Sequence, residues 1–245
     1  ILAKKPRTSC GFDGVTRQDL VSMPPPVQQA FCDLFQTAEV SGAWPQQLVD
    51  GKVVSLAKVP QPAGALDFRP ITIFGLLYRC WSTWHAKAAL QHVAAKLPDT
   101  LYGSRPGHYA AQVWAKLLWA IEVSFADQIA LSGLVADLQK AFNLLPRLAT
   151  FEIAAHMGIP GKVLVGWAAA LSQMQRRFVI QGSLTTGIGS VTGFPEGCAL
   201  SCIAMLLVDV AFHRWMDVFF PMCQAITYVA CMHSPKLHCW SQGLP

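Results

Sequence analysis

Hydrophobic and polar residues recur along this chain with two different spacings, one typical of strands and the other typical of helices. Lys52–Val59 alternates and is rich in valine, and Phe68–Phe74 is a β-branched run, so we predict two strands that pair antiparallel. Shorter strands are predicted at Arg176–Gln181 and at Ala225–Val229. Ala130–Ala136 carries no charge and is predicted to be a buried strand.

Apolar residues spaced three to four positions apart predict helices between these strands. The predicted helices are a short one from Asp19–Leu20 that Pro24–Pro26 interrupts, one with Val27, Ala30, Phe31, Leu34 and Phe35 on a single face, and five more at Leu76–Leu97, Tyr109–Val123, Pro146–Met157, Gly161–Met174 and Ala199–Phe212. A chain of 245 residues, of which 53% are hydrophobic and 13% are charged, can bury a sizeable core. We therefore predict an α+β fold and exclude a disordered chain.

Charge and cysteine content narrow the class of protein only slightly. The net charge of +5 fits a polyanionic partner, and it fits a slightly basic protein equally well. The eight cysteines form no Cys-x-x-Cys pair, which indicates free thiols in a reducing, intracellular compartment. The spacing of Cys223, Cys231 and Cys239 with His233 and His238 fits no zinc template.

Apolar stretches along the chain are short. The longest, Ile203–Val208, ends at Asp209 and falls far below the roughly 20 residues that span a bilayer. No signal peptide is recognisable near the start. We therefore expect no membrane association.

One carboxylate stands out because it follows an uncharged stretch. Asp137 comes directly after the predicted strand at Ala130–Ala136, where a charge needs compensation. It can cap the next turn, which is the more common arrangement for a lone acid, or it can bind a divalent cation. Phe142 follows five residues later and can face the same cavity.

Two further groups could belong to the same site. Gly193–Ser201 reads GFPEGCALS, and its glycines allow the backbone to approach a flat ligand closely. Lys58 and Arg69 lie on the two strands that we expect to pair, so both cations could contact one triphosphate.

Five segments, in this order, resemble motifs of the reverse transcriptase family, particularly of its non-LTR retrotransposon and group II intron branch. They read GFDGVT, LAKV followed by FRPITI, LPDTLYGSRPGHYA, VADLQKAFN and TGFPEGCALS. The resemblance covers nearly the whole chain, from Lys4 to about Val229. Each motif alone is weak, and the order and spacing of the five give the resemblance its specificity.

The resemblance implies a right-hand polymerase with fingers and palm, in which an antiparallel palm sheet packs on helices and the thumb is absent. Residues 1–128 would form the fingers and the connection to the palm. Residues 129–245 would form the palm, with inserted fingers helices at about 146–181. The implied partners are an RNA or DNA template with its primer and deoxynucleoside triphosphates.

The resemblance also implies a role for each matching residue. Asp137 would be the first catalytic aspartate and would hold two Mg²⁺ ions, while Phe142 would exclude a ribose 2′-hydroxyl. Lys58 and Arg69 would contact the incoming triphosphate. The loop against the templating base and the primer would be formed by Gly193, Pro195, Glu196 and Gly197, with Glu196 standing where the family often carries Gln.

Three arginines could contact nucleic acid. The resemblance suggests that Arg105 helps to hold the template backbone. Arg176 and Arg177 could line a nucleic-acid cleft, or they could simply flank a strand. Five tryptophans (Trp81, Trp84, Trp114, Trp119 and Trp167) could stack on bases, but at helical spacing we expect most of them in the core. His85, which has no carboxylate partner in the pattern, is expected to have a surface or packing role.

The family pattern fails at its third catalytic motif, which should carry two aspartates in a tight hairpin. Here ITYV at Ile226–Val229 continues with Ala230 and Cys231, and no aspartate follows Asp217. We expect Asp209 and Asp217 to be solvent-facing or capped rather than replacements. A frameshift near Val229 would explain the loss of pattern, and we expect the chain to be a fragment.

With Asp137 alone, the second Mg²⁺ would lack ligands, because two-metal catalysis requires carboxylates that bridge both ions. We therefore predict a reverse transcriptase-like domain with little or no polymerase activity. The alternative is a non-catalytic remnant that binds nucleic acid.

Overall fold

The computed structural model describes residues 10–133, 137–138, 140–221, 223 and 226. It divides into two compact units, each built from two segments of the chain. The first unit consists of Ile1–Val93 and Phe142–Ala204, and the second of Ala94–Ala141 and Met205–Pro245. The expected boundary between residues 128 and 129 falls inside the second unit. These units are defined by compactness and not by polymerase subdomains, so the fingers and palm assignment stays a prediction.

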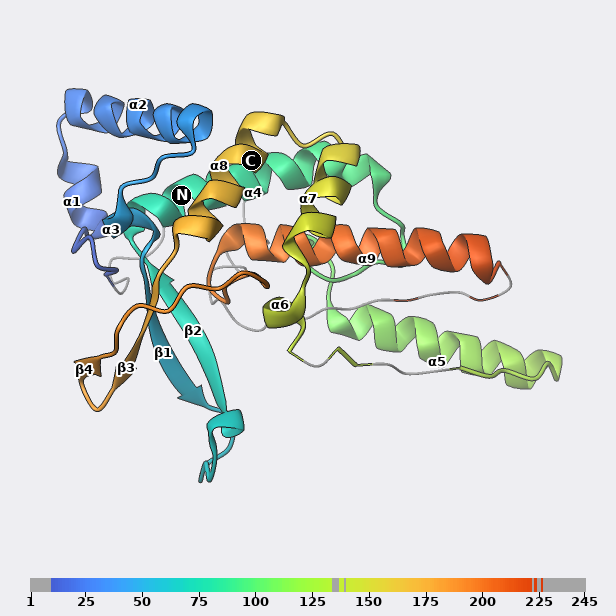
Figure 1. Ribbon diagram of the computed structural model, residues 1–245. Helices are drawn as coiled ribbons and strands as arrows, with labels where there is room; N and C mark the ends of the chain where they lie inside the picture. The colour runs from blue at the N-terminus through green and yellow to red at the C-terminus, as the bar shows by residue number, and fades with distance from the viewer. Residues whose placement is uncertain (1–9, 134–136, 139, 222, 224–225, 227–245) are drawn as a thin grey trace. The chain divides into compact units, whose positions relative to one another are not determined.

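A four-stranded sheet belongs to the first unit (Figure 1). Its strands are β1 (Gly51–Ala57), β2 (Phe68–Phe74), β3 (Arg176–Ile180) and β4 (Ser183–Leu184), in the order β2-β1-β3-β4. β1 and β2 pair antiparallel from Gly51↔Phe74 to Ala57↔Phe68, which confirms the predicted pair.

The sheet is mixed, and three of its four strands lie in segments assigned to the fingers, so the expected antiparallel palm sheet stays a prediction. β1 pairs parallel with β3 through Gly51↔Arg176, Lys52↔Arg177 and Val53↔Phe178. β3 then pairs antiparallel with β4. Parallel neighbours need a long connection, and here more than a hundred residues separate the two strands.

The helices wholly within the first unit are α1 (Arg17–Ser22), α2 (Pro25–Ser41), α3 (Gln46–Val49), α4 (Leu76–Val93), α7 (Arg147–His156) and α8 (Gly161–Gln173). Their ends follow local chemistry. The Thr16 side chain caps α1 in a capping box with Asp19, proline occupies the first position of α2, and Gly42 ends α2 in the left-handed region. The predicted helices in these regions are confirmed to within a few residues.

Two groups of packed aromatic rings form much of the core of the first unit. One group contains Trp44, Phe74, Tyr78 and Trp81, and Trp44 contacts Trp81 edge-on at 4.9 Å between ring centroids. The other group consists of Phe151, Trp167 and Phe194. On α2 the buried residues are Ala38 and Glu39, whereas Val27 and Ala30 of the predicted apolar face are exposed.

The expectation that most of the five tryptophans lie in the core is wrong. Trp81 and Trp167 are each only 1% exposed, but Trp84, Trp114 and Trp119 are more than 60% exposed. Helical spacing places side chains on one face, but it does not determine whether another element covers that face.

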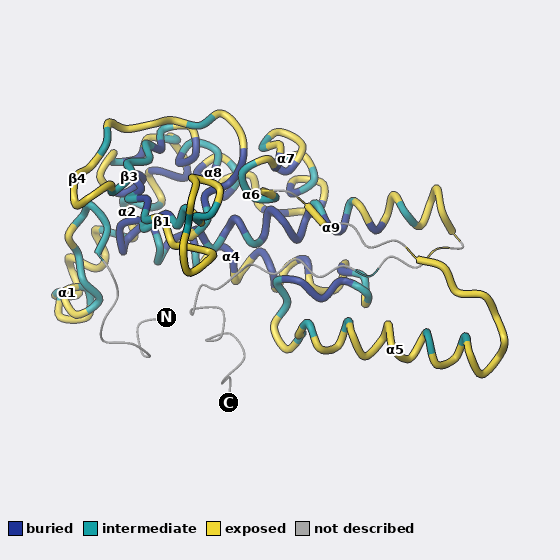
Figure 2. The backbone as a smooth tube through the Cα atoms, turned by 90° about the horizontal axis from the view of Figure 1, so that it is seen from below, coloured by how far each residue is buried: buried dark blue, intermediate teal, exposed yellow. Residues whose placement is uncertain are grey.

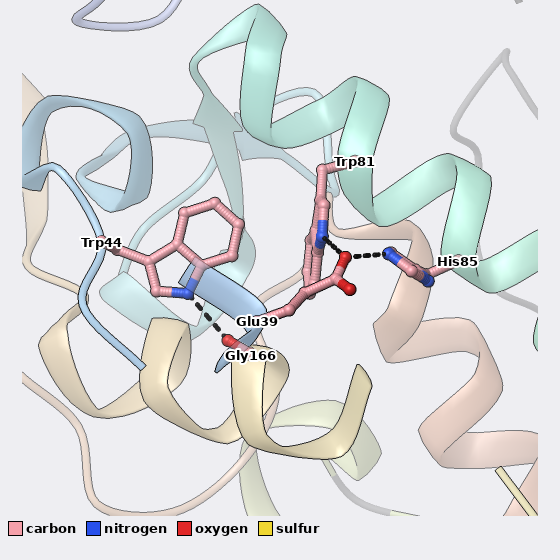
Figure 3. A network of polar contacts seen from close by, with 5 residues as sticks. All are labelled: Glu39, Trp44, Trp81, His85 and Gly166. Carbon is pink, nitrogen blue, oxygen red and sulfur yellow. Dashed lines mark hydrogen bonds and ion pairs between the residues drawn. The ribbon is translucent and has the colours of Figure 1, made fainter. Parts of the chain in front are cut away.

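A buried polar network crosses the core of the first unit (Figure 3). Glu39 Oε1 accepts a hydrogen bond from Trp81 Nε1 at 2.9 Å and lies 2.7 Å from His85 Nε2. Nearby, Trp44 Nε1 donates to the carbonyl of Gly166 at 2.9 Å. His85 therefore has a carboxylate partner, which the sequence pattern did not indicate. Burial lowers the pKa of His85, and the hydrogen bond and charge of Glu39 oppose this shift.

The second unit contains α5 (Ala110–Asp127) and most of α9 (Ala199–Phe219), whose first residues, up to Ala204, belong to the first unit. Helix α6 (Ala141–Leu144) begins at Ala141, the last residue of the Ala94–Ala141 segment, and continues in the first unit. α5 has no buried residue, whereas the first half of α9 is largely buried, as the colouring of Figure 2 shows. Both helices were predicted, although α9 continues seven residues further than the pattern indicated.

Two predicted strands lie partly outside the described residues. Residues 130–133, the described part of Ala130–Ala136, are exposed and form no strand, so this prediction is wrong there. Leu131, for example, is 53% exposed. Of Ala225–Val229, only Ile226 is described, and it belongs to no strand.

Helix α9 is also the one described helix long and apolar enough to cross a membrane, by length and composition alone. Of its most apolar window, 56% is buried within the structure, as in the core helix of a globular protein. Asp209 lies in this helix and is buried, so the expectation of a solvent-facing or capped acid is wrong for it. Asp217 is exposed, as expected.

Candidate nucleotide and nucleic-acid site

The candidate site begins with the hairpin formed by β1 and β2. Leu56 pairs with Arg69, so Arg69 and Lys58, two residues beyond Leu56, are diagonal neighbours on one face of the hairpin. Both residues are exposed. Lys58 Nζ donates to the carbonyl of Leu66 at 2.9 Å, which holds this side chain over the hairpin turn. The two cations therefore lie on one face of the hairpin, and their contact with a shared triphosphate stays a prediction.

The glycine loop at residues 193–197 is shaped by two left-handed glycines, Gly193 (φ 71°) and Gly197 (φ 117°). A Cβ on Gly193 would overlap the carbonyl of Asn143, and a Cβ on Gly197 would overlap the carbonyl of Thr72. Only glycine fits either position, because both the dihedral angle and the close approach exclude a side chain.

Backbone hydrogen bonds fasten this loop to two other parts of the first unit. Phe194 N donates to the carbonyl of Phe142 at 2.7 Å, and Gly193 N donates to the carbonyl of Leu145 at 3.0 Å. On the other side, Thr72 N, in the middle of β2, donates to the carbonyl of Glu196 at 2.7 Å. Phe142, the glycine loop and β2 are therefore joined directly.

The carboxyl group of Glu196 lies where these parts meet. Its Oε1 accepts a hydrogen bond from Asn143 Nδ2 at 3.1 Å. Burial raises the pKa of Glu196, while the Asn143 hydrogen bond and the positive charges of Lys58 and Arg69 oppose the rise. Lys58 and Arg69 are thus close enough to Glu196 to affect its pKa, and the roles that the resemblance implies for these residues stay predictions.

Pro195 and the cysteine that follows the loop have structural roles. Pro195 is buried, and its carbonyl accepts hydrogen bonds from Ser201 Oγ at 2.9 Å and from the backbone N–H of Cys198 at 3.3 Å. These bonds lead the chain into α9, which begins at Ala199. The loop is thus held by its own backbone, and the Glu196 side chain projects from a rigid support.

Arg176 and Arg177 point to opposite faces of β3, because neighbouring residues of a strand alternate. Arg177 Nη2 lies 3.9 Å from Asp50 Oδ2, so it has an acidic partner. Arg176 borders a small hollow that is also lined by Arg147, Leu171, Met174, Ser190, Gly193 and Pro195. The two arginines therefore differ, although the sequence treats them alike.

Arg105 and Asp137 belong to the second unit. Arg105 Nη1 donates to the carbonyls of Pro98 and Leu101 at 2.8 and 3.0 Å, so its guanidinium braces the turn that precedes α5. Asp137 is exposed. Its position relative to Phe142 and the glycine loop stays a prediction.

The described residues do not fit the pair of Mg²⁺ ions that the resemblance implies. Among residues 10–133, 137–138, 140–221, 223 and 226, no three His, Cys, Asp or Glu side chains are grouped as a metal site. Asp137 belongs to no such group among these residues, and a pair of Mg²⁺ ions needs several carboxylates to hold it. We therefore derive no catalytic step through magnesium.

Sequence reasoning missed three residues of this site, Thr72, Asn143 and Arg147. Thr72 and Asn143 hold the glycine loop through the bonds described above. Arg147 donates to the carbonyl of Gly193 through Nε at 2.7 Å. The sequence carries a weak signal for Asn143, since it directly follows Phe142, but none for Thr72 or Arg147.

The comparisons with known proteins add no identification. No protein-family model and no curated protein matches this chain.

Proposed function

We propose that this chain is a reverse transcriptase-like domain whose first unit binds nucleotide and nucleic acid and whose polymerase activity is impaired. One observation carries the proposal. The loop at residues 193–197 is bonded to β2 and to Phe142, and its Glu196 lies within the electrostatic influence of Lys58 and Arg69. These residues come from three of the five segments that resemble the family's motifs.

The chemistry of this neighbourhood suits a deoxynucleoside triphosphate. Two exposed cations on one face of a hairpin can contact a polyphosphate, and an arginine can do so with two parallel N–H donors. A phenylalanine beside a loop of tight backbone can contact a sugar and a base. The resemblance assigns these functions to the same residues.

Impaired catalysis follows from the carboxylates. Template-directed DNA synthesis requires activation of a primer 3′-hydroxyl and neutralisation of the leaving pyrophosphate, which two metal ions supply in this family. The sequence has no aspartate after Asp217, and Asp209 is buried within α9. The chain thus keeps groups for binding but lacks the set of carboxylates for the chemical step.

Primer extension tests the catalytic part of this proposal. The purified chain is incubated with a primer–template, the four deoxynucleotides and Mg²⁺, and Asp137→Ala is run beside it. We expect no extension above the level of Asp137→Ala. Extension that depends on Asp137 would show that the chain is an active polymerase and would contradict impairment.

Binding tests the part that an inactive remnant would keep. We expect fluorescence anisotropy to show binding of a primer–template with an affinity that falls as salt rises, because phosphate contacts release counterions. Arg69→Gln should weaken binding of a deoxynucleoside triphosphate, with Lys52→Gln, also on the hairpin, as the matched control. Equal triphosphate affinity in Arg69→Gln and the unaltered chain would remove the assigned role of the hairpin.

A further inference from the structure

Arg147 and Arg176, which we call the arginine pair, lie together in the first unit. Arg147 is the first residue of α7, and Arg176 is the first residue of β3. Both border the same small hollow and both are partly buried. Burial and, to a smaller extent, the positive charge of Arg176 lower the pKa of Arg147, which together with the shared hollow indicates that the two guanidinium groups are near each other.

No carboxylate in the described part of the chain neutralises this pair. Arg176 makes no side-chain hydrogen bond or ion pair with the described residues, and burial alone lowers its pKa. Arg147 donates only to backbone carbonyls, those of Gly193, Leu171 and Thr192. Two like charges that are partly removed from water are unfavourable unless an anion lies between or beside them.

The arginine pair still has donors to offer. A guanidinium carries five N–H groups, and Arg147 uses three of them on its carbonyl partners, which leaves two. Arg176 uses none of its five on the residues that the structure describes. Its backbone is fixed, because Arg176 N donates to the carbonyl of Ile188 and Ile188 N donates to the carbonyl of Arg176, both at 2.9 Å. The pair is therefore a preformed cluster of cationic donors.

We propose that the arginine pair binds one backbone phosphate of a nucleic-acid strand that passes the glycine loop. Guanidinium groups bind phosphate oxygens in paired N–H···O geometry, which this arrangement permits. The hollow is small and admits an oxygen rather than a nucleoside, so it suits a contact with the backbone. Its wall includes Gly193 and Pro195, so a strand bound here would run along the loop that contains Glu196.

The inference rests on the proposed function only for the identity of the anion as a nucleic-acid phosphate. The hairpin residues Lys58 and Arg69, which are assigned to the triphosphate, are not among those that line the hollow. The arginine pair is thus a second anion site, and it separates the roles of Arg176 and Arg177.

Arg176→Gln is the test variant because the Arg176 side chain makes no hydrogen bond or ion pair with the residues that the structure describes. Arg177→Gln is the matched control, since Arg177 is the next residue of the strand and is paired with Asp50. Without added anion, Arg176→Gln should unfold at a temperature equal to or above that of the unaltered chain, because it removes repulsion from Arg147. Sodium phosphate, compared with sodium chloride at equal ionic strength, should stabilise the unaltered chain and Arg177→Gln but not Arg176→Gln.

The nucleic-acid arm uses a fluorescein-labelled single-stranded oligonucleotide in a salt titration. We expect Arg176→Gln to lower the slope of log affinity against log salt by about one phosphate contact, roughly 0.7 for a single strand, and to weaken binding several-fold. Arg177→Gln should keep the slope. An unchanged slope in Arg176→Gln, or equal stabilisation of both variants by phosphate, overturns the proposal.

A third measurement identifies the source of the phosphate. The affinity for a deoxynucleoside triphosphate should be unchanged in Arg176→Gln, and its loss would show that the pair serves the nucleotide instead of the strand, which overturns the proposal. Failure of the proposed function has a different signature, because it would appear as loss of all salt-dependent oligonucleotide binding in the unaltered chain. In that case phosphate would still stabilise the chain through Arg176, but the assignment to nucleic acid would be refuted.

Discussion

The buried Asp209 makes a quantitative prediction about stability. Its residue is 6% exposed, and burial raises its pKa from 3.8 to about 7. The cause is desolvation, since removing a carboxyl group from water disfavours its charged form. Asp209→Asn keeps the shape of the side chain and removes the ionisation.

Proton binding determines whether the free energy of unfolding rises or falls with pH. Between pH 3.8 and about 7 the folded chain holds a proton on Asp209 that the unfolded chain has released, so the free energy of unfolding falls as pH rises through this window. The shift of about three units corresponds to roughly 4 kcal/mol, at about 1.4 kcal/mol per unit. This destabilisation is absent below pH 3.8, grows through the window and is complete above pH 7.

Urea unfolding of Asp209→Asn and the unaltered chain at pH 4.5, 6 and 8 measures this effect. We expect Asp209→Asn to gain stability relative to the unaltered chain as pH rises, up to about 4 kcal/mol at pH 8. Contributions of other groups, such as the lowered pKa of His85, are common to both chains and cancel in the difference. Asp127→Asn, at an exposed position, is the control and should show no such trend. Parallel stability curves for Asp209→Asn and the unaltered chain would refute the reasoning.

Three further predictions concern the first unit. Glu39→Ala leaves the Trp81 indole and the buried His85 without their acceptor, so it should lower the free energy of unfolding by about 3 kcal/mol. Glu39→Gln should lower it less, and equal urea midpoints for Glu39→Ala and the unaltered chain would contradict the prediction. Gly197→Ala places a Cβ against the β2 carbonyl of Thr72 at φ 117° and should lower the free energy of unfolding by about 2–3 kcal/mol. Gly14→Ala, with open space around the new Cβ, should lower it by about 1 kcal/mol. A lower thermal midpoint for Gly14→Ala than for Gly197→Ala would refute this reasoning. Glu196→Gln keeps an oxygen that can accept from Asn143 and removes a negative charge beside the hairpin cations. It should therefore raise the affinity for a deoxynucleoside triphosphate roughly fivefold, about 1 kcal/mol. Unchanged affinity in a filter-binding or calorimetric assay would show that Glu196 does not influence that ligand.

Much of the secondary structure was predictable because its signals are local. The β-branched run in β2 and the alternation of apolar and polar residues in β1 indicate strands independently of the tertiary fold. The short segment between the two strands allows them to pair. Helices α4, α7 and α8 show apolar spacing with proline or glycine at or near their ends.

The sequence-based predictions that failed share one cause. The spacing of apolar residues does not show whether another element of the fold covers a given residue. The uncharged stretch at Ala130–Ala136 looked like a core strand, but its described part is exposed. Asp209 looked like a surface acid on a helix, but it is buried. Trp84 and Trp81 have the same side chain and lie in the same helix, yet one is exposed and the other is in the core.

The candidate site was predictable in its parts but not in its construction. The sequence indicated Lys58, Arg69, Phe142 and the glycine loop. It could not indicate that Thr72 and Asn143 hold the loop, because both residues contact Glu196 from distant positions in the sequence. Thr72 lies 124 positions before Glu196, and Asn143 lies 53 positions before it. Nor could it separate Arg176 from Arg177, since only the parallel pairing of β3 with β1 places one beside Asp50 and the other beside Arg147.

The local pattern was enough to predict an α+β chain, the positions of most of its helices and of its first strand pair, and several residues of the candidate site. These features depend on local periodicity and local chemistry. The mixed sheet, the buried Glu39–His85 contact and the neighbours of each arginine became apparent only in the folded chain. Each of these depends on pairing between distant segments, where burial and electrostatic partners are set by packing that no local pattern encodes.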